Sequence, residues 1–155
     1  LFEFIRKPVL WFWGNEHRMA IYGLTAVERG IAAYGRCLGH GGMPINIRTK
    51  PRINPQKSPL VLYDDRECRR ASGTPVGYNG YVNLVFRGRR LTIEYRDIRE
   101  GDNRLLTESW EVRKGALRGK DIRLESSDAG LIQCHPHLHS AIALYPQQQP
   151  ERVLV

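Results

Sequence analysis

The 155-residue sequence contains no long apolar segment and only three cysteines. A membrane-spanning helix needs about 20 consecutive, mainly apolar residues, and no stretch of the chain approaches that length. Cys37, Cys68 and Cys134 are widely spaced and form no Cys-x-x-Cys pair. The sequence therefore predicts neither a disulfide framework nor a zinc ribbon. Reduced thiols favour a cytoplasmic protein, and no membrane partner is expected.

Acidic residues are also few in comparison with basic ones. The chain has 16 Asp and Glu residues against 24 Lys and Arg residues, which gives a net charge of +8. Such an excess is typical of proteins that meet an anionic partner, such as a nucleic acid or a phosphate ester. The alternative is a set of ordinary solvated faces, because the basic residues are spread along the whole chain. With 41% apolar residues, the chain is long enough for one domain with a core.

The most informative stretch begins with an apolar run, Val9 to Trp13, that stops at Gly14. Five large apolar residues in succession predict a strand buried on both faces. The polar residues Asn15, Glu16 and His17 follow, and a second apolar stretch over 19–23 predicts another strand. A loop at the carboxyl end of a strand is a common position for functional side chains.

This arrangement resembles the last motif of the calcineurin-like metallophosphoesterases, in which Gly-His-x-His follows a strand. Here the motif reads Gly14-Asn15-Glu16-His17. Residues 30–45 and 77–97 also resemble the end of a bacterial branch of this family, so the resemblance covers roughly residues 8–112. It implies an α/β fold, the calcineurin-like αββα sandwich, of which this chain forms a mostly β C-terminal portion. Residues 1–115 are then expected to belong to that domain, and 116–155 to an extension with a partly disordered tail.

The resemblance also implies a function, the hydrolysis of phosphate mono- or diesters by a hydrolase with two divalent metal ions (Mn, Fe or Zn). His17 matches the second His of the motif and is expected to be a metal ligand. Asn15 stands at the partner ligand position, where its amide oxygen is a poorer ligand for zinc- or iron-like ions than imidazole. His40 and Arg18 are candidates for substrate binding. These motifs identify no catalytic residue.

The family's earlier motifs, Asp-x-His, Gly-Asp-x-x-Asp and Gly-Asn-His-Glu, are not found, and the chain begins at Leu1. We therefore expect the C-terminal part of a longer enzyme, inactive alone, whose partner is the missing N-terminal part of the same domain. The competing interpretation is a non-enzymatic, β-rich and basic binding module with a degraded metal motif.

A third strand is predicted over residues 31–38, followed by a Gly-rich loop over 39–44 that contains His40. The loop lacks the Gly-Lys-Ser/Thr of a phosphate-binding loop. His40 either faces the site or lies on the surface. A short strand is predicted over 60–63. The adjacent carboxylates Asp64 and Asp65 are expected to be solvated, because neighbouring residues of an extended chain point to opposite faces.

Residues 78–110 show period-2 alternation broken by turns at 87–89 and 101–103, which predicts a three-stranded antiparallel meander. Val82, Leu84 and Phe86 mark the expected core face of its first strand. A nucleic-acid-binding sheet is the alternative, in which exposed aromatic residues would stack on bases. Its candidates are Tyr78, Tyr81, Phe86 and Tyr95. One more strand is predicted over 117–124.

A second metal candidate lies in Cys134-His135-Pro136-His137-Leu138-His139. Alternate histidines of an extended chain project to one side, where neutral imidazoles and a thiolate could hold zinc. However, Pro136 interrupts the segment, and structural zinc sites normally draw ligands from two places in a fold. Adventitious binding of zinc or nickel is the simpler interpretation.

Overall fold

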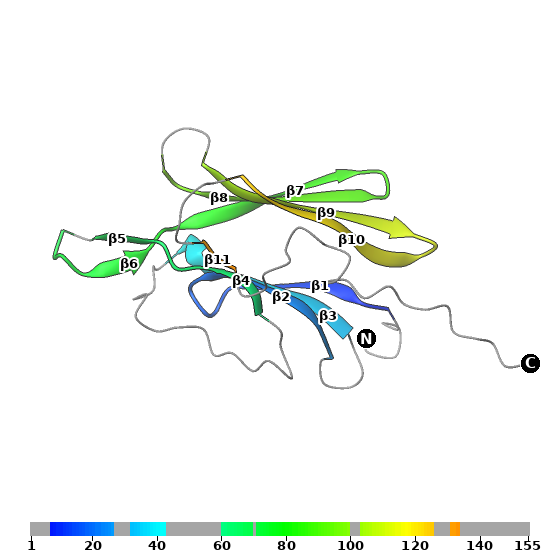
Figure 1. Ribbon diagram of the computed structural model, residues 1–155, viewed down its shortest axis with the longest axis horizontal. Helices are drawn as coiled ribbons and strands as arrows, with labels where there is room; N and C mark the ends of the chain where they lie inside the picture. The colour runs from blue at the N-terminus through cyan, green and yellow to red at the C-terminus, as the bar shows by residue number, and fades with distance from the viewer. Residues whose placement is uncertain are drawn as a thin grey trace, which may run out of the picture.

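The computed structural model describes residues 7–26, 32–42, 60–69, 71–99, 103–125 and 131–133. These residues are mostly β-strand, and their only helical segment is the short 3₁₀ turn η3 (Gly39–Gly41). Two sheets stack on one another, and a separate hairpin projects at one end (Figure 1). The predicted mainly β composition is confirmed. The second metal candidate, 134–139, lies outside the described residues.

The first sheet has five strands in the order β1-β3-β2-β4-β11. Its first two neighbours, β1 and β3, are parallel, and every other neighbouring pair is antiparallel. The strands predicted from the apolar runs are therefore present, and β2 extends further than the predicted residue 23. The five strands are β1 (Val9–Trp13), β2 (Met19–Ala26), β3 (Ala32–Leu38), β4 (Leu60–Asp64) and β11 (Leu131–Gln133).

The strand β1 differs from its prediction because it is not buried on both faces. Among the described strands it is the outermost of its sheet, its residues are half-buried or exposed, and Trp11 is 47% exposed. Leu10 and Phe12 still pack against the core, and Trp13 packs against a second apolar cluster. A short apolar run indicates a strand with apolar contacts on both faces, but it does not distinguish a central position from an edge.

The second sheet is an antiparallel meander with the order β10-β9-β8-β7. The three predicted strands and the predicted turn at 87–89 are confirmed, and Gly88 in that turn has φ 58°. The predicted fourth strand pairs with β9 along its length. Its strands are β7 (Gly80–Arg87), β8 (Arg90–Asp97), β9 (Arg104–Arg113) and β10 (Ala116–Leu124). The hairpin of β5 (Glu67–Arg69) and β6 (Pro75–Gly77) was not predicted.

The core lies between the two sheets, because each strand turns its alternate apolar residues toward the other sheet. The meander contributes Ile93, Tyr95, Leu106 and Trp110, whose side chains are buried. The same cluster includes Met19, Ile21, Tyr34, Val61, Leu62, Leu105 and Ile122. On the other face of the five-stranded sheet, a second cluster contains Ala20, Tyr22, Cys37, Leu60 and Tyr63.

An ion pair is enclosed in this core. Arg36 of β3 and Glu108 of β9 are both fully buried. The Arg36 Nε donates to Glu108 Oε2 at 2.9 Å, and Arg36 Nη2 pairs with Glu108 Oε1. The Tyr95 hydroxyl donates to Glu108 Oε2 at 2.9 Å, and Arg36 Nη1 donates to the backbone oxygen of Tyr22 at 2.7 Å. These bonds join the two sheets at one point and satisfy both charges.

The expected core face of β7 is correct only at one end. Val82 is half-buried, but Leu84 is 42% exposed and Phe86 is 70% exposed. β7 is the last strand of its sheet in the described structure. Alternation identifies which side chains share a face, but it does not show where the opposing sheet stops covering that face.

Candidate functional site

Three segments meet at one edge of the five-stranded sheet. β1 and β3 are parallel, and β4 points the same way because β3 and β4 are both antiparallel to β2. The carboxyl ends of these strands therefore share an edge, which is where ligands bind in many open sheets. The edge carries the loop 14–18, the η3 turn and the segment 64–66. All four predicted site residues lie on the first two: Asn15, His17, Arg18 and His40.

The loop Gly14–Arg18, called the site loop below, presents its polar residues unequally. His17 adopts a left-handed backbone with φ 53°, a conformation that few residues other than glycine adopt. Asn15 and His17 are exposed. Glu16 turns back onto the strand, where its Oε1 accepts a hydrogen bond from Trp13 Nε1 at 3.1 Å. The site loop therefore offers an imidazole and an amide to solvent, while Glu16 anchors the loop.

Two titratable groups lie behind the site loop and stay protonated near neutral pH. Burial and the neighbouring Glu16 carboxylate raise the pKa of Tyr22 to about 12. Burial likewise raises the pKa of the Cys37 thiol. Neither group is suited to act as a nucleophile or a base at neutral pH, so the chemistry of this edge depends on the histidines and arginines.

His40 lies inside the protein, although it belongs to a Gly-rich turn. It is 3% exposed, so the surface position considered for it is wrong. Among the described residues, neither of its ring nitrogens has a hydrogen bond of good geometry, although the Leu38 backbone lies close enough to favour the protonated ring. Burial lowers the pKa of His40, and the nearby Asp64 carboxylate opposes this effect only in part. The imidazole is therefore neutral near pH 7.

A small hollow opens between these segments. It has room for about one water molecule. Three of the four predicted site residues, His17, Arg18 and His40, line it, and Asn15 is not among the lining residues. Asp64 and Tyr78 line it too, together with Met19 and Gly77. The structure thus brings together residues from four separate segments of the chain.

Asp64 was expected to be solvated, but it is not. The side chain of Arg66, two residues later, covers its carboxylate. The Asp64 side chain is 7% exposed. Arg66 Nε donates to Asp64 Oδ1 and Arg66 Nη2 to Asp64 Oδ2, each at 2.8 Å. The backbone N–H of Arg66 also donates to Asp64 Oδ1, at 3.1 Å. Three of the carboxylate's acceptor positions are occupied by Arg66, so Asp64 contributes mainly charge to the hollow.

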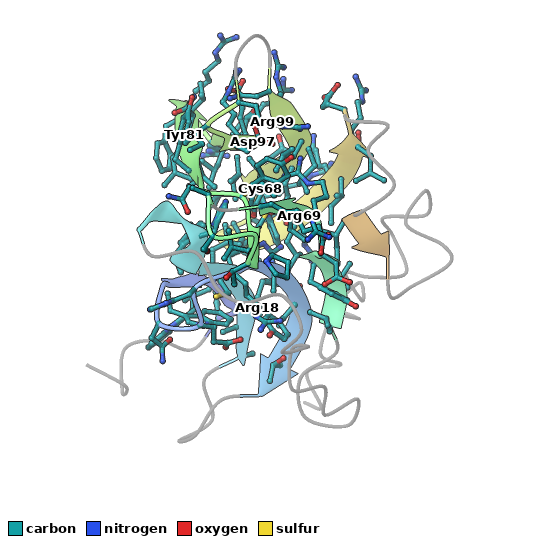
Figure 2. The ribbon with its side chains drawn as sticks, turned by 90° about the vertical axis from the view of Figure 1, so that its left-hand side faces the viewer. Arg18, Cys68, Arg69, Tyr81, Asp97 and Arg99 are labelled. Atoms are coloured by element: carbon teal, nitrogen blue, oxygen red, sulfur yellow. The ribbon has the colours of Figure 1, made fainter. Side chains whose placement is uncertain are left out.

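The same pattern recurs at the end of β8, and the two copies are joined. The backbone N–H of Arg99 donates to Asp97 Oδ1 at 3.0 Å, and Arg99 Nε donates to Asp97 Oδ2 at 2.8 Å. Arg66 Nη1 also donates to Asp97 Oδ2, at 2.8 Å. The Tyr78 ring lies 5.2 Å from the Arg66 guanidinium and 5.1 Å from that of Arg99. Figure 2 shows Asp97 and Arg99 side by side, with Arg18 on the other sheet.

The sequence held only a weak signal for this cluster. Asp-x-Arg occurs at 64–66 and 97–99, but also at 102–104 and 121–123. An aspartate often accepts a hydrogen bond from the backbone two residues later. The bond from Arg66 to Asp97 spans 31 residues and joins the two sheets. No local pattern predicts such a pairing, and it was missed.

The described residues do not by themselves form a metal centre. Within the ranges given above, no group of three or more His, Cys, Asp or Glu residues is placed to hold a metal ion. Asn15 and His17 are exposed donors on one loop. Asp64 is bound by Arg66, and His40 is buried with Gly80 at its ring edge. This donor set supplies at most two ligands.

Comparisons with protein-family models, with characterised proteins and with solved structures found no match for this chain. No helix in the described part of the chain is long and apolar enough to span a membrane.

Proposed function

We propose that this chain carries the last metal-binding loop of a calcineurin-like metallophosphoesterase and forms the β-rich C-terminal portion of its α/β sandwich. The main support is the position of His17. It is exposed on a loop at the carboxyl end of β1, at the edge where β3 and β4 also end. A ligand residue for a site outside the sheet is expected at this kind of edge.

The residues around His17 suit an anionic ester. Arg18 is half-buried and lines the same hollow as His17. A guanidinium pairs well with phosphate oxygens, so Arg18 would attract and orient the substrate. The chain's net charge of +8 would draw such a substrate toward the protein. His40 lies behind the site loop and fits a supporting position.

A two-metal centre, when bound, would activate a water molecule and stabilise the displacement at phosphorus. His17 would supply an imidazole to it and Asn15 an amide oxygen. The described residues do not complete such a centre. The remaining ligands would come from a further segment of the same domain. It follows that this chain alone is expected to be inactive.

A second candidate function is a non-enzymatic binding module that uses the positive charge of the chain. Asn15 in place of the motif's first histidine favours it, because a degraded motif suits a protein that needs no metal. On the meander, Tyr81 and Phe86 are 47% and 70% exposed and could contact a partner such as a nucleic acid. Tyr95 is fully buried, and the Tyr78 ring is in contact with the guanidinium groups of Arg66 and Arg99, so both are less suited to stack on a base.

The test compares the full-length protein, in which this chain would be the C-terminal part, with its His17→Ala and Asn15→His variants. The measurements are metal content by mass spectrometry and hydrolysis of a chromogenic phosphodiester with Mn²⁺. We expect the full-length protein to bind metal and hydrolyse the ester, His17→Ala to lose both properties, and Asn15→His to bind metal more tightly.

A full-length protein that binds no metal, and that gains none with Asn15→His, would favour the binding module. In that case binding of a fluorescent single-stranded oligonucleotide, measured against salt concentration, would test the nucleic-acid partner. Variants of Tyr81 and Phe86 would show whether the meander carries the interaction.

A further inference from the structure

The η3 turn lies directly beneath the site loop. The N–H of Gly39 donates to the backbone oxygen of Arg18 at 3.0 Å. A Cβ placed on Gly39 would lie under 3.0 Å from the Gly14 oxygen and from the His17 nitrogen. Real Cβ atoms essentially never approach backbone this closely. The site loop therefore packs on a position that only glycine can occupy, and His17 is one of the three site-loop residues in contact with it.

The other side of the η3 turn is fixed to the meander. A Cβ placed on Gly80, the first residue of β7, would collide with the His40 ring at Nε2 and Cδ2 and with the backbone oxygen of Arg96. The Asn79 side-chain amide donates to the backbone oxygen of Gly42 at 3.1 Å. The His40 ring is thus held between η3 and β7, and glycine is again required at the point of contact.

His40 performs this role by shape. It is 3% exposed, and neither of its ring nitrogens has a hydrogen bond of good geometry within the described ranges. A buried polar group that is poorly bonded adds little stability. The contribution of His40 therefore comes from the contact of its planar ring with the Gly80 backbone.

The left-handed backbone of His17 supplies the link to the site. A φ of 53° at a residue other than glycine persists only where the surroundings hold it. The surroundings are the Gly39 contacts, and Gly39 precedes His40 in the same turn. The chain of contacts runs from β7 and β8 through the His40 ring to the Gly39 backbone and then to His17.

We infer that His40 is a positioning residue for His17. Its ring fixes η3 against the meander, and η3 holds the site loop in the conformation that projects the His17 imidazole from the edge of the sheet. Where this concerns a metal ligand, it rests on the proposed phosphoesterase function. The coupling between His40 and His17 does not depend on that function and is tested separately.

The test uses the whole chain and reads His17 directly by NMR. The imidazole signals are assigned with His17→Gln, and exchange of the Gly39 amide is measured with solvent. His40→Ala removes the ring, His40→Phe keeps a planar ring without nitrogens, and Gly80→Ala displaces the ring from the other sheet. Tyr81→Ala is the matched control, because it changes the next residue of β7, a half-exposed one.

In His40→Ala and Gly80→Ala we expect the His17 signals to move toward those of an unstructured peptide. We also expect the Gly39 amide to exchange at least ~10-fold faster. His40→Phe should restore most of the wild-type signals, and Tyr81→Ala should leave them unchanged. Unchanged His17 signals and Gly39 exchange in both folded variants would overturn the inference. So would a His40→Phe protein that behaves like His40→Ala.

The wild-type protein provides a test that survives any failure of a variant to fold. If the meander holds η3, the opening that exposes the Gly39 amide to exchange should have a free energy close to that of the first amides of β7. Rapid Gly39 exchange beside a protected β7 would overturn the inference. If the full-length protein binds no metal but His40→Ala still shifts the His17 NMR signals, the phosphoesterase proposal is overturned and the coupling of His40 to His17 is not.

Discussion

Glu108→Gln is expected to destabilise the protein strongly, because Glu108 pairs with Arg36 inside the core. The substitution replaces one carboxylate oxygen by an amide and removes the negative charge beside Arg36. Arg36 is fully buried, so its charge would remain in the core without a carboxylate, next to the new amide and the backbone oxygens of Tyr22 and Gly35. Removing one partner of a buried pair costs about 3–5 kcal/mol, compared with roughly 5–15 kcal/mol for the whole fold.

The measurement is urea unfolding followed by tryptophan fluorescence, since Trp110 is buried in the same core and lies beside Arg36, 5.6 Å from its guanidinium. With a slope of ~2 kcal/mol/M, the midpoint should fall by about 2 M. Replacing both members by apolar residues, Arg36→Met with Glu108→Leu, should recover most of the loss, because no charge is then left buried.

The matched control is Glu111→Gln on the same strand. Glu111 pairs with Lys120 Nζ at 2.7 Å, but at the surface, and an exposed pair contributes little to stability. Its midpoint should barely move. Equal midpoint shifts for Glu108→Gln and Glu111→Gln would refute the view that the enclosed pair is the critical link between the sheets.

Three further predictions concern the site edge. Gly39→Ala should lower the free energy of unfolding by about 1–3 kcal/mol, whereas Gly14→Ala should be nearly neutral in the same denaturation assay, because its new Cβ would meet only Gly39 Cα, at 3.7 Å. The pKa of His40 is below its usual 6.5, so the unfolded chain binds more protons than the folded one below that pH. The free energy of unfolding should therefore fall as the pH drops below about 6.5. His40→Phe should reduce this fall, and equal pH dependence of the unfolding free energy in the two proteins would contradict a role for His40. Iodoacetamide should label Cys68 well before Cys37, which is fully buried; mass spectrometry of the digested protein distinguishes the two, and rapid native labelling of Cys37 would show that the core opens.

Local patterns in the sequence predicted most of the strands. The alternation over residues 78–110 located the strands of the meander, because successive side chains of a strand point to opposite faces, but it marked the buried face of β7 correctly only at Val82. The turn at Gly88 was visible because its positive φ favours glycine. The apolar run of β1 was equally visible, but its position at the sheet edge depends on which strands pair beside it.

The site was predicted only where its residues follow one another in the chain. Asn15, His17 and Arg18 were found because they follow a strand that ends in glycine. Asp64 was misjudged because its solvation depends on Arg66 folding back over it. The contact of His40 with Gly80 joins residues 40 positions apart, and its cause is the close approach of two backbones. Nothing in the local sequence encodes such an approach except the glycine itself.

The enclosed ion pair also constrains how the protein is made. Arg36 and Glu108 are 72 residues apart, and a ribosome adding 5–20 residues per second needs roughly 4–14 s to synthesise the intervening chain. During that interval β1 to β4 are synthesised before β9 and β11, so Arg36 has no Glu108 carboxylate to pair with. The N-terminal half of the chain is therefore expected to remain incompletely folded until β9 is synthesised, and chaperones would bind it in that state.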